Sequence, residues 1–195
     1  QTIDYALSRD FTVNLYLEDW SSGMRDSRDY LFTMMDELVK LPIKRFLLPD
    51  TLGILNPLQC VEYMRQMVRR YPNSHFDFHA HNDYDLAVSN SLAAVLSGAK
   101  GLHVTVNGLG ERCGNAPLAS VQVILKDMFE AKTNIKEDRL NDISRLVEGY
   151  SGIAVAPNTP VVGDNVFTQV AGVHADGDNK DKLYCNDLVP ERFGR

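Results

Sequence analysis

Four short runs of the chain read as strands, three of them alternate between apolar and polar residues, and longer segments with helical spacing separate all four. The runs cover residues 11–18, 46–49, 75–81 and 102–107. They recur at intervals of roughly 30 residues, which is the length of one strand-and-helix unit. Strands that alternate with helices in this way predict an α/β fold built on a parallel sheet.

Apolar residues spaced along one helix face predict five helices. These follow Ser27, begin at Pro57, cover residues 86–96, begin at Pro117 and cover residues 137–150. The start at Pro57 has the clearest signal, because Asn56 can cap a helix and proline is favoured at the first helical position. After Tyr150, prolines and glycines recur without a period, which is typical of a boundary. We therefore expect two parts, residues 1–150 and 151–195.

Three of the strand runs, 11–18, 75–81 and 102–107, carry a polar face, which a parallel sheet covered on both sides does not usually show. In the run 75–81 the polar residues are His75, Asp77, His79 and His81, and apolar residues stand between them. Side chains alternate between the two faces of a strand. If helices cover the outside of a barrel, the polar face lines its interior and forms a site near the strand ends. An antiparallel sheet with one face in water would show the same alternation.

Length and composition limit the possible architectures. The chain has 195 residues, of which 44% are hydrophobic and 24% charged, and a formal net charge of −6. A complete eight-stranded α/β barrel needs about 250 residues, so only part of one fits. The acidic balance and the lack of a dense Lys/Arg run argue against binding to nucleic acid or to a membrane surface. No stretch approaches the roughly 18 apolar residues of a spanning helix.

The cysteines and the start of the chain bear on its location. Cys60, Cys113 and Cys185 are scattered and form no CxxC pair. Such a set argues against a disulfide framework or a structural zinc site and favours the reducing cytoplasm. The chain starts with Gln1, and no signal-peptide pattern follows. We expect a cytoplasmic protein of which this chain is a part.

Two histidines separated by one residue are the strongest candidate for chemistry. His79 and His81 fall near the end of a predicted strand, so both imidazoles project from one face and can reach one metal ion. The carboxyl ends of barrel strands are where barrel enzymes hold their active sites. Two imidazoles with oxygen ligands suit Zn, Mn or Mg. A pair of structural histidines is the alternative that this motif leaves open.

Further candidates follow the other predicted strands. Glu18 ends the first run and can act as a general base, or it can be a capping or first-turn acid of the next segment. Thr51 can bind a substrate carboxylate, or it can shape the turn before Gly53. Asn115, in the glycine-rich loop 107–117, can ligate a metal through its amide oxygen or cap the next helix.

Three residues have weaker signals when taken alone. Arg112 can hold a carboxylate or a phosphate, or it can be an ordinary surface arginine. Cys113 is a loop thiol with no assignable histidine partner. His174 lies outside the barrel rhythm, in a polar segment that we expect to form turns.

Together the motifs resemble the Claisen-condensing synthases of the DRE-TIM metallolyase superfamily, which make isopropylmalate, citramalate or homocitrate. The combination of HAHND at residues 79–83 with NGLGERCGN at residues 107–115 is highly specific, and the similarity covers nearly the whole chain. It implies a TIM (β/α)8 barrel. This chain would carry the second half of that barrel, strands five to eight, and the start of a linker subdomain.

The resemblance also implies roles for individual residues. A divalent metal ion would be held by His79, by His81 and by an aspartate from an early barrel strand, with Asn115 in or beside that shell. The 2-oxo acid would chelate the metal while Thr51 binds its carboxylate. Glu18 matches the favoured base, which would take a proton from acetyl-CoA.

Other matches concern the substrates and a second subunit. A histidine matching His174 is delivered to the active site by the partner subunit, which implies a homodimer, and Tyr184 matches a residue near acetyl-CoA. Tyr16, Glu111 and Arg112 are further expected substrate contacts. Cys113 and Lys182 depart from the residues expected at their positions and leave the acetyl-CoA contacts open.

Our leading expectation is an acyltransferase that joins acetyl-CoA to 3-methyl-2-oxobutanoate, making 2-isopropylmalate for leucine biosynthesis. The bulk of Tyr16 supports an alternative, condensation with pyruvate to citramalate for isoleucine, and homocitrate formation is a third. A metal-dependent hydrolase and a noncatalytic barrel remain as distant alternatives. We expect the aspartate ligand in an additional N-terminal half and a regulatory domain beyond Arg195.

Overall fold

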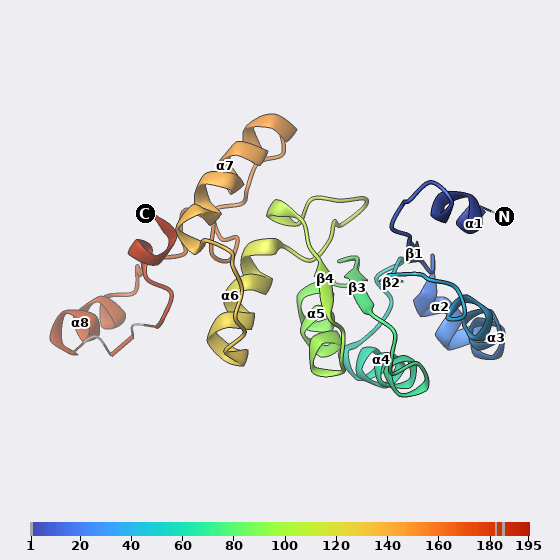
Figure 1. The fold of residues 1–195 in the computed structure, drawn as a ribbon. Coiled ribbons are helices and arrows are strands. Elements are labelled where there is room, and N and C mark those ends of the chain that lie inside the picture. Colours follow the sequence, from blue (N-terminus) through green and yellow to red (C-terminus); the bar gives the residue numbers. More distant parts are fainter. Residues whose placement is uncertain (1, 182, 185) are drawn as a thin grey trace. The chain divides into compact units, whose positions relative to one another are not determined.

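The computed structural model describes residues 2–181, 183–184 and 186–195. Lys182 and Cys185, which the sequence analysis named, lie outside the described residues. The chain splits into two compact units, Gln1–Ala116 and Pro117–Arg195, and each is described by itself (Figure 1). This boundary differs from residue 150, where we expect the linker to begin. That division concerns the complete domain and stays a prediction.

A four-stranded parallel sheet forms the centre of unit 1. Its strands are β1 (Asn14–Tyr16), β2 (Arg45–Asp50), β3 (Phe76–Ala80) and β4 (Gly101–His103). Their order in the sheet is β1-β2-β3-β4, and every neighbouring pair is parallel. This confirms the predicted α/β class and rules out an antiparallel arrangement for these strands.

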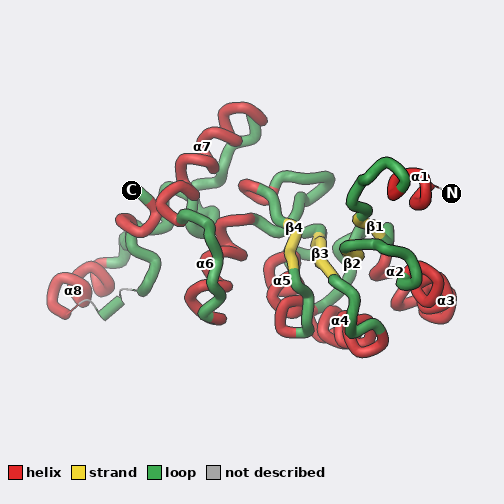
Figure 2. Tube along the Cα trace, in the orientation of Figure 1, coloured by secondary structure: helices red, strands yellow, loops and turns green. Residues whose placement is uncertain are grey.

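Helices connect each strand to the next, as parallel pairing requires. α2 (Trp20–Asp26) and α3 (Arg28–Leu38) link β1 to β2, α4 (Pro57–Arg70) links β2 to β3, and α5 (Ala87–Leu96) links β3 to β4. α1 (Thr2–Leu7) precedes the sheet, and the 3₁₀ turn η1 (Val106–Gly108) follows it. The connecting helices line up along one side of the sheet (Figures 1 and 2).

Three strands are shorter than their alternating runs predict. β1 covers three residues of the run 11–18, β3 covers five residues of the run 75–81, and β4 ends at His103. Asn107 has a φ of 57° and Asp19 a φ of 56°, which is left-handed backbone that a strand cannot contain. These turns place the polar residues Glu18 and Asn107 beyond the strand ends, on the carboxyl-terminal rim of the sheet.

The two faces of the sheet differ as the alternation predicts. The register places Tyr16 beside Leu47, Leu47 beside Asp77 and His79 beside His103, so these residues share one face. The opposite face is mostly apolar. Phe46, Leu48, Phe76 and Phe78 are buried there, and the buried carboxylate of Asp50 lies at its carboxyl end. This apolar face is the one that α2 and α5 cover.

The sheet curves around its polar face. In a flat sheet, β1 and β4 would lie about 14 Å apart, because two strands separate them. Yet Oη of Tyr16 on β1 lies 2.6 Å from Nδ1 of His103 on β4, within hydrogen-bond distance. The contact requires the strands to bend toward one another, as they do in part of a barrel. We call the inner side the concave face.

α4 begins where the sequence predicts. Oδ1 of Asn56 accepts a hydrogen bond from the backbone N–H of Gln59 at 2.9 Å, and the Gln59 side chain accepts one from the backbone of Asn56 at 3.2 Å. This is a complete capping box, with Pro57 at the first helical position. Near the other end, Arg70 pairs with Asp36 of α3 at 2.7 Å. The helix that links β2 to β3 is thus fixed at both ends.

Unit 2 is mainly helical. It contains α6 (Leu118–Phe129), α7 (Leu140–Ser151), α8 (Gly172–Asp181) and the 3₁₀ segments η2 (Glu137–Arg139) and η3 (Pro190–Phe193). The largest members of its buried core are Val123, Leu140, Val161, Val162 and Phe193. Among the described helices, none has the length and apolar character needed to cross a membrane.

α8 corrects our expectation that the segment around His174 forms turns. Gly177 is the one residue of this helix that is buried. The helix therefore has no periodic apolar face from which the sequence could predict it. The helix instead carries an ion pair between Lys180 and Asp176, one turn apart, at 2.6 Å. Outside the helix, Gln169 donates to Asp178 at 2.6 Å.

Candidate metal and substrate site

The histidine pair lies at the carboxyl end of β3. His79 belongs to the strand and His81 follows Ala80, so both side chains leave the same side of the backbone. Their ring centroids are 4.9 Å apart, and the ring planes meet at 88°. An isolated backbone bridge joins His81 to Asn115 of the glycine-rich loop. The structure therefore brings the three expected metal ligands of this chain together.

Asn115 is held by its own loop. Its side-chain NH₂ donates to the carbonyl of Leu109 at 2.9 Å, which turns Oδ1 the other way. A side chain at Gly110 would collide with this amide, so glycine is needed for the close approach. Asn115 does not cap the following helix, because α6 has Pro117 at its N-cap and no side-chain capping bond. Its amide oxygen therefore stays available to bind a ligand.

The buried polar atoms of this group fit a divalent metal ion. Nδ1 of His79, Nδ1 of His81 and Oδ1 of Asn115 are buried, and none has a hydrogen-bond partner among the described residues. Because buried polar atoms nearly always have partners, three partnerless ones on neighbouring residues point to a ligand. Nitrogen and amide oxygen donors are suitable for Zn, Mn or Mg.

The electrostatics of His79 agree with this interpretation. Burial, followed by the neighbouring His81 and His103, lowers the pKa of His79 to about 4. The imidazole is therefore neutral at pH 7, which is the form that binds a metal. Within the described part of the chain, no cluster of three or more His, Cys, Asp or Glu side chains is arranged to hold a metal. These residues thus supply part of a ligand set.

Glu18 and Thr51 meet on the rim between β1 and β2. The Thr51 hydroxyl donates to Oε1 of Glu18 at 2.9 Å and accepts from the backbone N–H of Asp19 at 3.0 Å. The buried carboxylate of Asp50 accepts two backbone N–H groups of the following turn, at 3.0 and 3.1 Å, and so fixes the segment that carries Thr51. Glu18 and Thr51 follow the carboxyl ends of β1 and β2, and His79 lies near the carboxyl end of β3, so these residues lie along the same rim of the sheet.

Tyr16 also faces this site, from the concave face. Its hydroxyl contacts His103, and Nε2 of His103 lies 3.7 Å from the buried carboxylate of Asp77. Burial, followed by the charges of Glu18 and Asp77, raises the pKa of Tyr16, so the hydroxyl keeps its proton. Asp77 belongs to the polar face expected for its strand, but the sequence pattern indicated no role for Asp77 or for His103. Their meeting depends on sheet curvature, which alternation does not report.

Arg112 is hydrogen-bonded to other residues of unit 1, and Glu111 next to it faces solvent. The Arg112 guanidinium makes two hydrogen bonds to Asp83, at 2.7 and 3.1 Å, and one to the carbonyl of Thr51 at 2.6 Å. Its side chain thus ties the glycine-rich loop to the turn after β2, next to Gly53, where an added Cβ would meet Asp83. The Glu111 side chain is 84% exposed. Their expected role in substrate binding stays a prediction.

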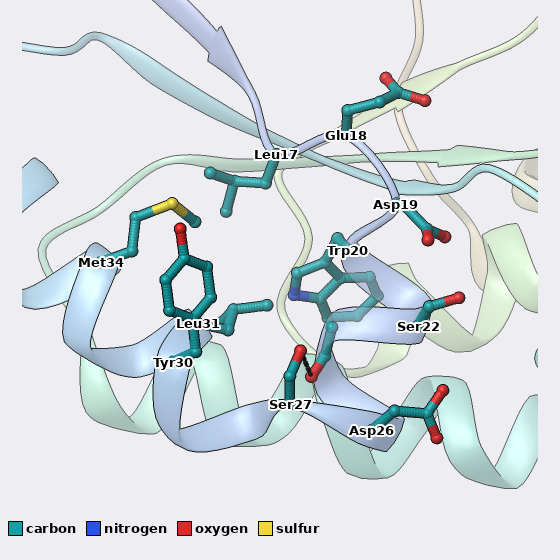
Figure 3. Close-up of a pocket in the computed structure, with 11 residues that line it drawn as sticks. Leu17, Glu18, Asp19, Trp20, Ser22, Asp26, Ser27, Tyr30, Leu31 and Met34 are labelled. Atoms are coloured by element: carbon teal, nitrogen blue, oxygen red, sulfur yellow. Dashed lines mark hydrogen bonds between the residues drawn. The ribbon is translucent and has the colours of Figure 1, made fainter.

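A small cavity of about 280 Å³ lies on the helix side of β1. Figure 3 shows Leu17, Trp20, Leu31 and Met34 around it, while the Glu18 carboxylate points away from these apolar side chains. Leu17 and Glu18 alternate along the chain, so they point to opposite sides. Apolar side chains form much of the cavity lining, and Glu18 and Asp19 also line it.

His174 and Tyr184 come together in unit 2. His174 lies on α8, and its ring centroid is 4.5 Å from that of Tyr184 with 35° between the planes. Both line a cavity of about 720 Å³ within unit 2. The expected residues thus form two groups, one in each unit.

Comparison with known proteins places the chain in a family. Residues 1–147 match the HMGL-like family. A putative (R)-citramalate synthase of Methanopyrus kandleri is 37% identical over 197 residues, which cover 100% of this chain and 38% of that protein. A homocitrate synthase of Saccharolobus islandicus is 42% identical over 195 residues, covering 100% of this chain and 41% of that protein. The chain thus spans about two fifths of the length of these relatives.

The fold has a counterpart among solved structures. HMG-CoA lyase of Bacillus subtilis superposes with a TM-score of 0.72 at 21% identity, covering 82% of this chain and 55% of that chain. At this identity the likeness shows the fold, and it agrees with the curved parallel sheet of a partial barrel. The expected superfamily and barrel class are confirmed, and the chain belongs to the HMGL-like family.

Proposed function

We propose that the complete protein carrying this chain catalyses a metal-dependent Claisen condensation of acetyl-CoA with a 2-oxo acid. The observation that carries the proposal is the group of partnerless buried atoms on His79, His81 and Asn115, at the carboxyl rim of a barrel-type sheet. A metal-dependent hydrolase and a noncatalytic barrel receive no support from the relatives, which are named as synthases.

The relatives favour our alternative substrates over the leading expectation, because they are named for citramalate and homocitrate and not for 2-isopropylmalate. Between the two, the concave face favours pyruvate. 2-Oxoglutarate brings a distal carboxylate, which needs a basic partner. Arg45 is the one lysine or arginine in the four strands, and it lies at the opposite end of the sheet from His79 and pairs with Asp77 at 3.4 Å. Tyr16 adds bulk, which suits a short substrate.

In this reaction, each of these side chains has a separate role. A divalent ion held by His79, His81 and Asn115 would polarise a keto carbonyl as a Lewis acid. The Glu18 carboxylate takes a proton from the methyl group of acetyl-CoA, the resulting carbon nucleophile adds to the keto carbon, and the keto oxygen takes up a proton to become the product hydroxyl. Hydrolysis of the thioester releases CoA and makes the overall reaction irreversible.

Thr51 links substrate binding to the base. Its hydroxyl has one proton, which it donates to Glu18 in this structure. A substrate carboxylate that takes this hydrogen bond therefore releases Glu18 from it. The Asp19 N–H keeps the Thr51 oxygen in place during the exchange. We infer that the 2-oxo acid binds first and frees the base for acetyl-CoA.

His174 and Tyr184 complete the proposal. We assign them to the acetyl-CoA part of the active site of a partner subunit, which makes the protein a homodimer. We also propose that this homodimer acts in the cytoplasm. Their shared cavity in unit 2 supports a joint role, because one ligand there would contact both rings.

The test is a substrate panel with the full-length protein in Mn²⁺. Free-thiol release is measured with acetyl-CoA and either pyruvate, 2-oxoglutarate or 3-methyl-2-oxobutanoate, and mass spectrometry identifies each product. We expect the highest kcat/KM with pyruvate, and citramalate as the product. A preference for one of the other acids would correct the substrate. If none of the acids causes thiol release from Mn²⁺-loaded protein, the condensation proposal is wrong.

A further inference from the structure

Three polar side chains connect β1, β4 and β3 across the concave face. The Tyr16 hydroxyl lies 2.6 Å from Nδ1 of His103, and Nε2 of His103 faces a carboxylate oxygen of Asp77 at 3.7 Å. The ring centroids of Tyr16 and His103 are 5.6 Å apart in an edge arrangement. Neither His103 nor Asp77 has a part in the chemistry described above.

Asp77 is the fixed end of this connection. It is 2% exposed, and its carboxylate contacts Nε2 of His75 at 2.8 Å and the Arg45 guanidinium at 3.4 Å. Gly101 of β4 packs so closely against it that an added Cβ would collide with the carboxylate. A buried carboxylate held from three sides cannot move to follow a substrate. It therefore gives His103 a stationary neighbour.

The direction of the hydrogen bond follows from this charge. The nearby carboxylate of Asp77 favours the His103 tautomer that carries its proton on Nε2. Nδ1 is then an acceptor, and the Tyr16 hydroxyl donates to it. Both ring nitrogens of His103 consequently have neighbours, unlike the partnerless Nδ1 atoms of His79 and His81. Because both of its ring nitrogens face other side chains, we do not count His103 among the metal ligands.

We propose that His103 is a positioning residue that holds the Tyr16 ring in one orientation beside the 2-oxo-acid pocket and so limits the length of the substrate. The inference rests on the proposed function and adds a specificity-determining residue to it. Without the hydrogen bond, the Tyr16 side chain, which is 49% exposed, would have room to take other rotamers. The pocket would then admit longer acids.

Four variants of the full-length protein test this role. His103→Gln places its amide near the position of Nε2 and removes the acceptor, whereas His103→Asn keeps an oxygen near the position of Nδ1. Tyr16→Phe removes the same hydrogen bond from the other side and leaves His103 intact. His75→Gln is the matched control, because His75 contacts Asp77 but not Tyr16. The readout is the ratio of kcat/KM for pyruvate to kcat/KM for 3-methyl-2-oxobutanoate.

We expect His103→Gln and Tyr16→Phe each to lower this ratio by about 5- to 10-fold, the size expected for one lost hydrogen bond. The change should lie mainly in KM. His103→Asn should recover part of the ratio, and the double variant should fall no further than either single one. Mn²⁺ content should stay the same in all variants, and His75→Gln should keep the ratio within about twofold of the unchanged protein.

Three results would overturn the role of His103. They are an unchanged ratio in His103→Gln, multiplicative effects in the double variant, and an equal shift in His75→Gln. A wild-type protein that binds Mn²⁺ but condenses none of the acids would be a different failure, since it would remove the proposed function and this role together.

Discussion

At the residue scale, the site depends on single hydrogen bonds. The Thr51 hydroxyl donates one to Glu18 in this structure, and the Tyr16 hydroxyl forms one with His103. His79, His81, Glu18 and Thr51 can be predicted from the sequence because alternation and strand ends locate them. The two hydrogen bonds cannot be predicted in this way, since residues 33 and 87 positions apart meet only after the sheet has formed and curved.

Thr51 offers a direct test at this scale. Thr51→Val keeps the shape of the side chain but removes the donor, so both the hold on Glu18 and the contact with a substrate carboxylate are lost. We expect kcat/KM for the 2-oxo acid to fall by about 10- to 100-fold, because the lost bonds involve charged groups. Thr51→Ser keeps the hydroxyl and should stay within about fivefold of the unchanged protein. Equal losses in both variants, measured by thiol release, would exclude the donor role.

At the element scale, helices and strands could be predicted where capping residues or apolar periodicity mark them in the nearby sequence. The start of α4 is predicted by Asn56 and Pro57, because a capping residue and a proline at the first helical position are adjacent in the sequence, and the structure adds Gln59 to complete a capping box. α8 was not predicted, because it buries little and has no apolar face. β1 and β4 were predicted too long, because alternation continues through Glu18 and Asn107 although the backbone turns there.

The capping box of α4 can be measured. Asn56→Ala removes the side chain that accepts from Gln59, so we expect the free energy of unfolding to fall by about 1 kcal/mol. Asn56→Asp keeps an acceptor at the same position and should recover most of this loss. Urea unfolding followed by circular dichroism gives both numbers. An Asn56→Ala protein as stable as the Asn56→Asp protein would show that the cap contributes nothing.

At the scale of the whole molecule, each unit has its own stabilising contacts. In unit 2 the Glu137 carboxylate, which is 5% exposed, contacts Arg192 at 2.8 Å and Lys126 at 2.6 Å. Arg192 also pairs with Asp127 at 2.7 Å. These contacts tie η3, near the end of the chain, to α6, and the expected division at residue 150 stays a prediction. Pairings over such separations leave no local pattern in the sequence.

This ion cluster predicts a pH dependence. The hydrogen bond from Arg192, above all, lowers the pKa of Glu137 from 4.5 to about 2. A lowered carboxyl pKa contributes stability that is present above about pH 4.5 and is lost as the pH falls toward 2. Glu137→Gln should therefore cost about 2–3 kcal/mol at pH 6 and clearly less at pH 3.

Urea unfolding at the two pH values tests this, with Asp138→Asn as the control. Asp138 lies in the same 3₁₀ turn but is 58% exposed, so its replacement should change stability by less than about 0.5 kcal/mol at either pH. A loss in Glu137→Gln that is as large at pH 3 as at pH 6 would contradict the assignment to this carboxylate.

The central claim is that His79 and His81, with Asn115, hold a divalent ion at the rim of the sheet. Calorimetric titration of Mn²⁺ into chelator-stripped, full-length protein tests it most directly. We predict one site per chain, with the affinity lowered by roughly 100-fold or more in His79→Gln and in His81→Gln, and little changed in His75→Gln. Mn²⁺ binding of equal strength in wild-type protein and both histidine variants would contradict the claim.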